Sequence, residues 1–261
     1  MRLDKYLADA GCGTRSELKK SIRRGMAAVD GNVIRDVGFH VPEDASVTFQ
    51  GRPVKAEKQV YYMLHKPAGV ITAVTDRTER TVMDLMGGAP GKGLYPVGRL
   101  DRDTEGLLLI TNDGKLGHYL LAPGHHVDKI YFARVSGTVT DEDVRAFREG
   151  LVLGDGVRCL SADLKILSVS GPGADDGTPE GDGSPENNTT PPGTSEVEIT
   201  ICEGKYHQIK RMFRAVGKEV VYLKRLAMGP LRLDEALPAG SWRALTEAEL
   251  NELLASVPVY S

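Results

Sequence analysis

Apolar and polar positions alternate along much of this chain, and the alternation predicts more strands than helices. Residues 107–110 (Leu-Leu-Leu-Ile) form an apolar run bounded by Gly106 and by the turn-forming pair Asp113-Gly114, the pattern of a strand buried on both faces. Further strands are predicted at residues 61–65, 70–74, 129–138, 157–169, 196–202 and 220–226. Because the strands come in pairs and outnumber the helices, we expect an α+β fold with a largely antiparallel sheet.

Helix signals are fewer, and capping residues mark the clearest of them. Thr14, with Glu17 three positions later, has the capping-box pattern for a helix that runs to Arg24. A shorter helix around Leu3 and Leu7 precedes it. Three more helices are predicted at residues 115–121, at 141–148 behind Thr140, and at 205–216, where the helix is basic and amphipathic.

The order of these elements predicts two domains. Residues 1–58 hold the first two helices and a hairpin whose turn is Asp30-Gly31, and the polar stretch 50–59 has the composition of a linker. Residues 59–261 form the larger domain. Within it, residues 170–195 contain Ala174 as their only apolar side chain, so this segment cannot offset its ordering entropy and is predicted to be a disordered insertion.

Charge is distributed unevenly along the chain. The formal net charge of −3 argues at first against an RNA partner. Residues 170–195, however, hold five carboxylates and no Lys or Arg, while residues 1–58 hold 11 basic against 8 acidic residues and residues 201–232 hold 8 against 2. Two basic segments therefore fit a polyanion partner better than the total charge does.

Cysteine usage and the amino terminus indicate the compartment. The three cysteines are far apart, without Cys-x-x-Cys spacing, which predicts reduced thiols and no metal site. His125-His126 has no partner at metal-ligand spacing, so no metal is expected there either. No long apolar stretch follows Met1–Lys5, which argues against a signal peptide or a membrane span. We expect a cytoplasmic protein, and a monomer.

Asp101 is the first candidate for chemistry. Together with Arg99 and Arg102 it lies on the loop that leads into the predicted buried strand. A rigid strand behind a charged loop is how folds position reactive groups. The alternative is that Asp101 only pairs with Arg99 or Arg102.

The predicted helix after Thr14 carries five cations within ten residues: Arg15, Lys19, Lys20, Arg23 and Arg24. Spacings of four place several of them on neighbouring faces, where like charges repel unless a polyanion lies across them. The alternative is an ordinary solvated helix surface.

Residues 98–114 closely resemble the catalytic signature of the pseudouridine synthases, in their RsuA-like branch. The agreement covers Gly98, Arg99, Leu100, Asp101, Thr104, Gly106, Leu107 and Leu108 and continues to Asp113-Gly114. The resemblance implies that Asp101 is the nucleophile, attacking either the sugar or the base of a uridine. It also implies that Arg99 fills the gap left when the target nucleotide is flipped out; otherwise Arg99 is a partner of Asp101 or of a phosphate.

Two further matches complete the resemblance in the larger domain. Residues 203–212 (Glu-Gly-Lys-Tyr-His-Gln-Ile-Lys-Arg-Met) match the motif whose cation pairs with the catalytic aspartate, here Lys210 by position, with Arg211 as the adjacent candidate. A carboxylate in a water-poor pocket needs such a cation to stay ionised; the alternative is a basic helix that touches phosphates. Tyr131 matches the aromatic residue that stacks on the uracil and can take the proton from carbon 5, although a Tyr in an alternating strand is otherwise a core residue.

The first domain resembles the small RNA-binding domain named after a ribosomal small-subunit protein, through Arg2-Leu3-Asp4-x-x-Leu7, Thr14-Arg15-Ser16 and Val29-Asp30-Gly31. The resemblances together imply a ribosomal RNA pseudouridine synthase that needs no cofactor and acts on ribosomal RNA or a pre-ribosomal particle. The start Met1–Lys5 and the pair His207-Gln208 favour small-subunit RNA. The alternatives are large-subunit RNA and a non-catalytic RNA-binding assembly factor, which would not need Asp101, Tyr131 and Lys210 together.

Overall fold

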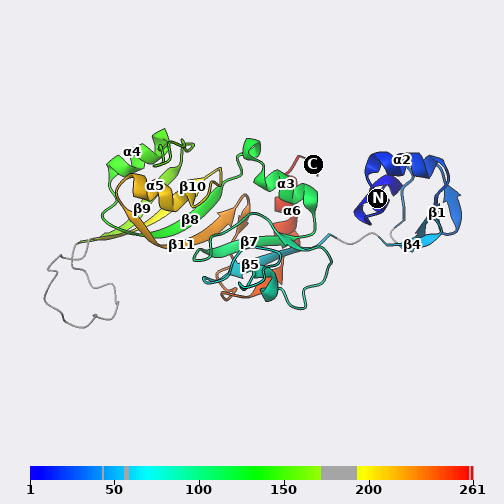
Figure 1. The fold of residues 1–261 in the computed structure, drawn as a ribbon, viewed down its shortest axis with the longest axis horizontal. Coiled ribbons are helices and arrows are strands. Elements are labelled where there is room, and N and C mark those ends of the chain that lie inside the picture. Colours follow the sequence, from blue (N-terminus) through cyan, green and yellow to red (C-terminus); the bar gives the residue numbers. More distant parts are fainter. Residues whose placement is uncertain (43, 56–58, 172–192, 259, 261) are drawn as a thin grey trace. The chain divides into compact units, whose positions relative to one another are not determined.

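The computed structural model describes residues 1–42, 44–55, 59–171, 193–258 and 260. The chain divides into two compact units, Met1–Gln59 and Val60–Ser261 (Figure 1). Each unit buries a hydrophobic core of its own, and the larger unit buries two.

The first unit packs two helices against a small antiparallel sheet. Helix α1 spans Leu3–Asp9 and α2 spans Arg15–Arg23, and Thr14 caps α2 in a capping box with Glu17, as predicted. The sheet has the order β2-β1-β3-β4, with β1 Ala27–Val29, β2 Asn32–Ile34, β3 Val47–Phe49 and β4 Arg52–Val54. The predicted hairpin at Asp30-Gly31 is confirmed, since both residues have positive φ between β1 and β2.

The expected linker at residues 50–59 is wrong over its first half. Gln50 and Gly51 are a tight turn with φ of 51° and 75°, and Arg52–Val54 return as strand β4 beside β3. Pro53 misled the prediction because proline is rare in central strands, but β4 is an edge strand, where a missing N–H costs little. Residues 56–58 lie outside the described residues.

The larger unit is built on a nine-stranded sheet. Seven strands follow the order β13-β5-β7-β11-β8-β10-β9, and the other two are β6, which pairs with β7, and β12, which pairs with β11. The bounds are β5 Tyr61–Lys66, β6 Tyr95–Pro96, β7 Glu105–Thr111, β8 Lys129–Ser136, β9 Asp163–Ser170, β10 Thr194–Ile201, β11 Glu219–Met228, β12 Leu231–Arg232 and β13 Trp242–Ala244. The helices are η1 Val82–Leu85, α3 Gly114–Leu121, η2 Pro123–His125, α4 Asp141–Glu149, α5 Gln208–Ala215 and α6 Glu247–Ala255. All described strand pairs are antiparallel except β7 with β11, which confirms the α+β expectation.

Strand β7 is buried on both faces, as the apolar run predicted. Leu108 and Ile110 join the core that also contains Phe147 of α4 and Phe213 of α5. Leu107 and Leu109 join a second core with residues of α3 and α6. Figure 1 shows α4 and α5 beside β8–β10, and α3 and α6 near β5 and β7. The strand that follows Asp101 is therefore held rigidly between two cores.

Three predicted elements of the larger unit differ from the structure. Residues 70–74 are not a strand and form only one bridge, between Ile71 and Thr81. Strand β9 begins at Asp163 rather than at residue 157, because residues 157–162 form a loop that buries Cys159 and Ala162. Helix α5 begins at Gln208 rather than Lys205, because His207 adopts φ 47°, which is incompatible with a helix.

The prediction that residues 170–195 are disordered is wrong at both ends of this segment. Ser170 ends β9, and Thr194 and Ser195 begin β10. Ser195 is fully buried because its hydroxyl donates to Gly137 O and accepts from Val139 N, so a polar side chain is satisfied inside the fold. Residues 172–192 lie outside the described residues.

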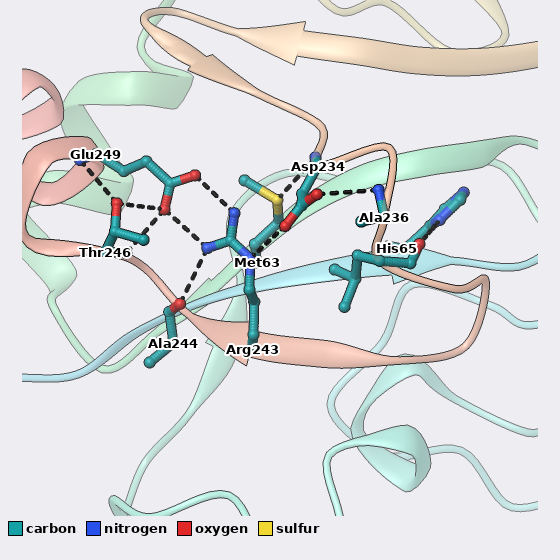
Figure 2. A network of polar contacts seen from close by, with 9 residues as sticks. Met63, His65, Asp234, Ala236, Arg243, Ala244, Thr246 and Glu249 are labelled. Carbon is teal, nitrogen blue, oxygen red and sulfur yellow. Dashed lines mark hydrogen bonds and ion pairs between the residues drawn. The ribbon is translucent and has the colours of Figure 1, made fainter.

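The carboxyl-terminal part of the chain is fastened to the sheet through Arg243 of β13 (Figure 2). Its Nε donates to Asp234 Oδ2 at 2.8 Å, and its Nη1 and Nη2 donate to the two oxygens of Glu249 at 2.8 and 2.7 Å. Glu249 also accepts from the backbone and hydroxyl of Thr246, which begins α6. This bidentate pair joins α6 to β13 and, through β13, to β5.

We expect the free energy of unfolding to fall when the pH is lowered from about 4.5 towards 2. Hydrogen bonds from Arg243 lower the pKa of Glu249 from 4.5 to about 2, and the same guanidinium lowers the pKa of Asp234. Because the folded-state pKa lies below the unfolded one, the stabilisation is complete above pH 4.5 and is lost as the pH falls through about 2. Urea unfolding at several pH values measures this. In Arg243→Met the free energy of unfolding should fall less between pH 4.5 and 2 than in the wild type, whereas the exposed control Arg214→Met should behave like the wild type.

Candidate active site

Asp101 lies on the loop that enters β7, and hydrogen bonds fix this loop. The Thr72 hydroxyl donates to Leu100 O at 2.8 Å and accepts from Leu100 N at 3.1 Å, and Thr104 N donates to Asp101 O at 3.1 Å. Behind the loop, Gly106 lies so close to β11 that a Cβ there would be 2.2 Å from Arg225 O. The backbone around Asp101 is thus set by its neighbours, while its carboxylate stays 26% exposed.

Lys66 holds the backbone that follows Asp101 from inside the protein. It is fully buried at the end of β5, and its ammonium donates to the carbonyl oxygens of Pro67, Arg102 and Thr104 at 3.0, 3.2 and 2.9 Å. Burial lowers the pKa of Lys66 to about 8, so the group is charged at neutral pH and its three protons meet three acceptors. Sequence analysis assigned no role to Lys66, which lies between the predicted strands 61–65 and 70–74.

Lys66→Met is expected to destabilise the protein by about 1–3 kcal/mol, because buried carbonyl groups of the Asp101 loop lose their donor. Turnover should fall as well, since the loop is no longer fixed. Urea unfolding and single-turnover assays measure the two effects. Lys115→Met on the exposed side of α3 is the matched control; equal stabilities of the two variants would contradict the anchoring role.

The side chains of Lys210 and His207 approach the Asp101 carboxylate, both from the α5 region. Lys210 Nζ lies 3.7 Å from Asp101 Oδ2, and His207 Nε2 lies 3.5 Å from Asp101 Oδ1. Lys210 is closer still to Asp103, at 2.5 and 2.6 Å from its two oxygens. Although desolvation opposes the shift, the hydrogen bond and charge of Lys210 lower the pKa of Asp103. The ammonium therefore lies between two carboxylates.

Tyr131 reaches the same place from β8. Arg99, Asp101, Tyr131 and Lys210 line one pocket, together with His207. Tyr131 is 7% exposed and faces the pocket from the buried side of β8, with Lys129 and Ala133, whereas Ile130 and Phe132 on the other side are only half-buried. The structure thus brings together the four residues that the resemblance connected: a carboxylate, a cation, an aromatic ring and an exposed guanidinium.

The neighbouring arginines point to other carboxylates. Arg211 Nη2 lies 2.5 Å from Asp155 Oδ1, and Arg102 Nη1 lies 3.2 Å from Glu79 Oε1. Within the described part of the chain, neither Arg99 nor Arg102 forms an ion pair with Asp101. Of the two candidates on α5, Lys210 is therefore the one beside Asp101.

His207 and Asp103 are site residues that sequence reasoning missed as such. His207 stacks on Tyr206, with ring centroids 3.9 Å apart, and its left-handed backbone turns its ring towards Asp101. The available signal was its place within the matched motif 203–212, which also contains Lys210. Tyr206 itself is 76% exposed at the rim.

The five cations of the first unit lie along α2 and at its end. Arg15, Lys19, Lys20, Arg23 and Arg24 are all exposed. Arg15 Nη2 is also 3.0 Å from the buried carboxylate of Asp4, which Arg2 approaches as well. Four of the five cations thus have no ion pair among the described residues, which leaves them available to a polyanion.

Among the described residues, no group of three or more His, Cys, Asp and Glu side chains is placed to hold a metal ion. None of the described helices has both the length and the apolar character that a membrane span requires.

Comparisons with known proteins agree with this geometry. Residues 60–215 match the family model described as RNA pseudouridylate synthase, and residues 1–47 match that of the S4 domain. An uncharacterised RNA pseudouridine synthase of Bacillus subtilis, YtzG, is 41% identical over 97% of this chain and 98% of the relative. The ribosomal small subunit pseudouridine synthase A of Vibrio cholerae is 36% identical over 97% and 99%. A crystal structure of a pseudouridylate synthase aligns with a TM-score of 0.63 and 32% identity, covering 97% of this chain and 99% of that one.

Proposed function

Because this chain belongs to the family of RNA pseudouridylate synthases, we propose that it converts a specific uridine of ribosomal RNA, in the small subunit, to pseudouridine. Asp101 acts as the nucleophile, Tyr131 as the stacking residue and base, and Lys210 as the charge partner of Asp101. The observation that carries these roles is the single pocket that all three residues line.

The reaction is an isomerisation, so no atom is gained or lost overall. The bond between N1 of the uracil and C1′ of the ribose breaks, the base rotates, and a bond from C5 to C1′ forms. The proton on C5 leaves and N1 gains one. A carboxylate that attacks either the sugar or the base must be ionised beforehand, and Lys210 at 3.7 Å supplies the opposite charge. The phenol of Tyr131 lies in the same pocket and is the group we assign to the C5 proton.

Arg99 and Arg211 bind the RNA in this proposal. The target base must leave the RNA stack to reach a pocket carboxylate, and Arg99, exposed at the pocket, is suited to occupy the vacated space with its planar guanidinium. Arg211, paired with Asp155, is assigned to contacts with the backbone of the RNA. No cofactor or metal enters the mechanism, and we propose that the protein acts as a monomer in the cytoplasm.

The relatives do not by themselves distinguish the two ribosomal subunits. A small subunit pseudouridine synthase A of Vibrio parahaemolyticus is 37% identical, and a large subunit pseudouridine synthase B of Bacillus subtilis is 35% identical over a similar length. The start Met1–Lys5 and the pair His207-Gln208 favour the small subunit. A map of pseudouridines in both ribosomal RNAs from cells with and without this protein tests the proposal. Loss of a large-subunit pseudouridine would assign the target to the large-subunit RNA instead. If no pseudouridine were lost, the non-catalytic RNA-binding role would be the one left.

Neutralising Arg15, Lys19, Lys20, Arg23 and Arg24 together should weaken RNA binding and leave the single-turnover rate at saturating RNA nearly unchanged. All five are exposed on the S4-domain unit, and the residues assigned to chemistry lie in the other unit. Fewer counterions should be released, so the plot of log affinity against log salt should become flatter by roughly 0.7 to 0.9 per lost contact. Binding of an rRNA transcript across several KCl concentrations measures this, and an unchanged slope with unchanged affinity would contradict it.

A further inference from the structure

Two buried cations next to Tyr131 have no role in the mechanism above. Lys129 and Arg225 lie on the neighbouring strands β8 and β11, where Arg225 is the register partner of Tyr131. Arg225 is 2% exposed and Lys129 is 8% exposed. Cations at this depth are rare unless an opposite charge meets them.

The hydrogen bonds of the two side chains satisfy them only in part. Arg225 Nε donates to Leu107 O at 2.7 Å, but its buried Nη2 has no hydrogen-bond partner among the described residues. Lys129 Nζ donates to Val127 O at 2.7 Å. Burial, and next the positive charge of Arg225, lower the pKa of Lys129. Neither side chain forms an ion pair within the described part of the protein.

Both residues border a cavity of about 520 Å³ that adjoins the active-site pocket. Arg99, Tyr131 and Lys205 line the cavity and the pocket alike. Glu203, the one carboxylate among the described residues that line the cavity, forms an ion pair with Lys205 and accepts a hydrogen bond from Gln208. The cavity therefore has a surplus of positive charge on the side of Lys129 and Arg225. A water molecule could accept a hydrogen bond from Nη2 but could not offset two like charges.

We propose that Lys129 and Arg225 form a subsite for a phosphodiester group of the RNA strand that carries the target nucleotide. This inference rests on the proposed function for the identity of the ligand. A phosphodiester brings one negative charge and several acceptor oxygens, which match the unpaired Nη2 and the ammonium. A flipped nucleotide must carry its flanking phosphates with it, and this cavity opens beside the ring on which its base would stack. The subsite positions the strand and takes no part in bond making.

Lys129→Met is the variant to test, because Arg225 also holds Leu107 O and its loss could disturb the sheet. Lys165→Met is the matched control, since Lys165 is an exposed lysine on β9 of the same sheet and lies outside the lining of the cavity. Lys129→Arg should restore binding if charge at this position is what matters. Melting temperatures of the full-length variants report on folding.

The first measurement needs no RNA. Crystals of the wild-type protein are soaked with tungstate as a phosphate mimic, and an anomalous peak is expected within hydrogen-bond distance of Lys129 Nζ and absent in Lys129→Met. The second measurement is the affinity for a small-subunit rRNA transcript across several KCl concentrations. Lys129→Met should bind about tenfold or more weakly, with a salt slope shallower by roughly one contact, while Lys165→Met should match the wild type.

An empty cavity in the tungstate soak would overturn the subsite. So would a tungstate peak combined with equal RNA affinity and salt slope in Lys129→Met and Lys165→Met, which would show an adventitious ion only. Failure of the proposed function would appear separately, as a wild-type protein that forms no pseudouridine, and the tungstate and binding measurements would still decide the subsite.

Discussion

Purified Asp101→Asn protein is expected to form no measurable pseudouridine while it keeps the wild-type melting temperature and RNA affinity. The change is nearly isosteric, and the hydrogen bonds that fix the Asp101 loop, between Thr72 and Leu100 and from Thr104 N to Asp101 O, are retained. An amide cannot serve as the nucleophile, so the rate should fall by at least about 10⁴-fold, as for other enzymes that lose a nucleophile.

Asp103→Asn is the matched control for that experiment. Asp103 lies two residues away on the same loop and is also bonded to Lys210. Because Asp101 would then have Lys210 to itself, this variant should retain turnover. Detectable isomerisation by Asp101→Asn in a single-turnover assay, with wild-type contamination excluded by mass spectrometry, would remove Asp101 from the mechanism.

Lys210→Met should lower the single-turnover rate by about 10²–10³-fold with a much smaller change in RNA affinity. The ammonium is the cation that the pocket brings to Asp101, and loss of one charged group that stabilises a reacting centre has an effect of this size. His207 remains 3.5 Å from the carboxylate, so the loss should be incomplete. Lys210→Arg, which keeps the charge, should be milder.

Arg211→Met separates a catalytic from a binding role on α5. Arg211 is paired with Asp155 and points away from Asp101, so its loss should weaken RNA binding and change the rate at saturating RNA little. If Lys210→Met behaved in the same way, with normal single-turnover rates and reduced affinity, Lys210 would be a phosphate contact.

Several parts of the fold were predictable because local chemistry decides them. Thr14 and Thr140 begin helices because a hydroxyl followed three residues later by a carboxylate satisfies free backbone N–H groups, whatever the rest of the fold does. The run Leu107–Ile110 is a strand because only a position between two cores suits four consecutive apolar side chains.

Other parts depend on partners far away in the sequence. Pro53 is tolerated in β4 only because that strand is at an edge, and Ser195 is buried only because Gly137 and Val139 meet its hydroxyl. Lys210 and Arg211 are adjacent on one helix, and the sequence does not determine which of the two side chains lies beside Asp101. That choice is made by the positions of Asp155 and of the loop before β7.

The sheet of the larger unit has a narrow seam. Strands β7 and β11 are joined by only two residue pairs, Lys224 with Glu105 and Arg225 with Gly106, and Gly106 permits the close approach. Asp101 precedes β7 on one side of this seam, whereas Tyr131 and Lys210 belong to β8 and α5 on the other. The nucleophile meets its partners only where the two halves are joined, so activity recovered after refolding reports a formed seam as well as formed secondary structure.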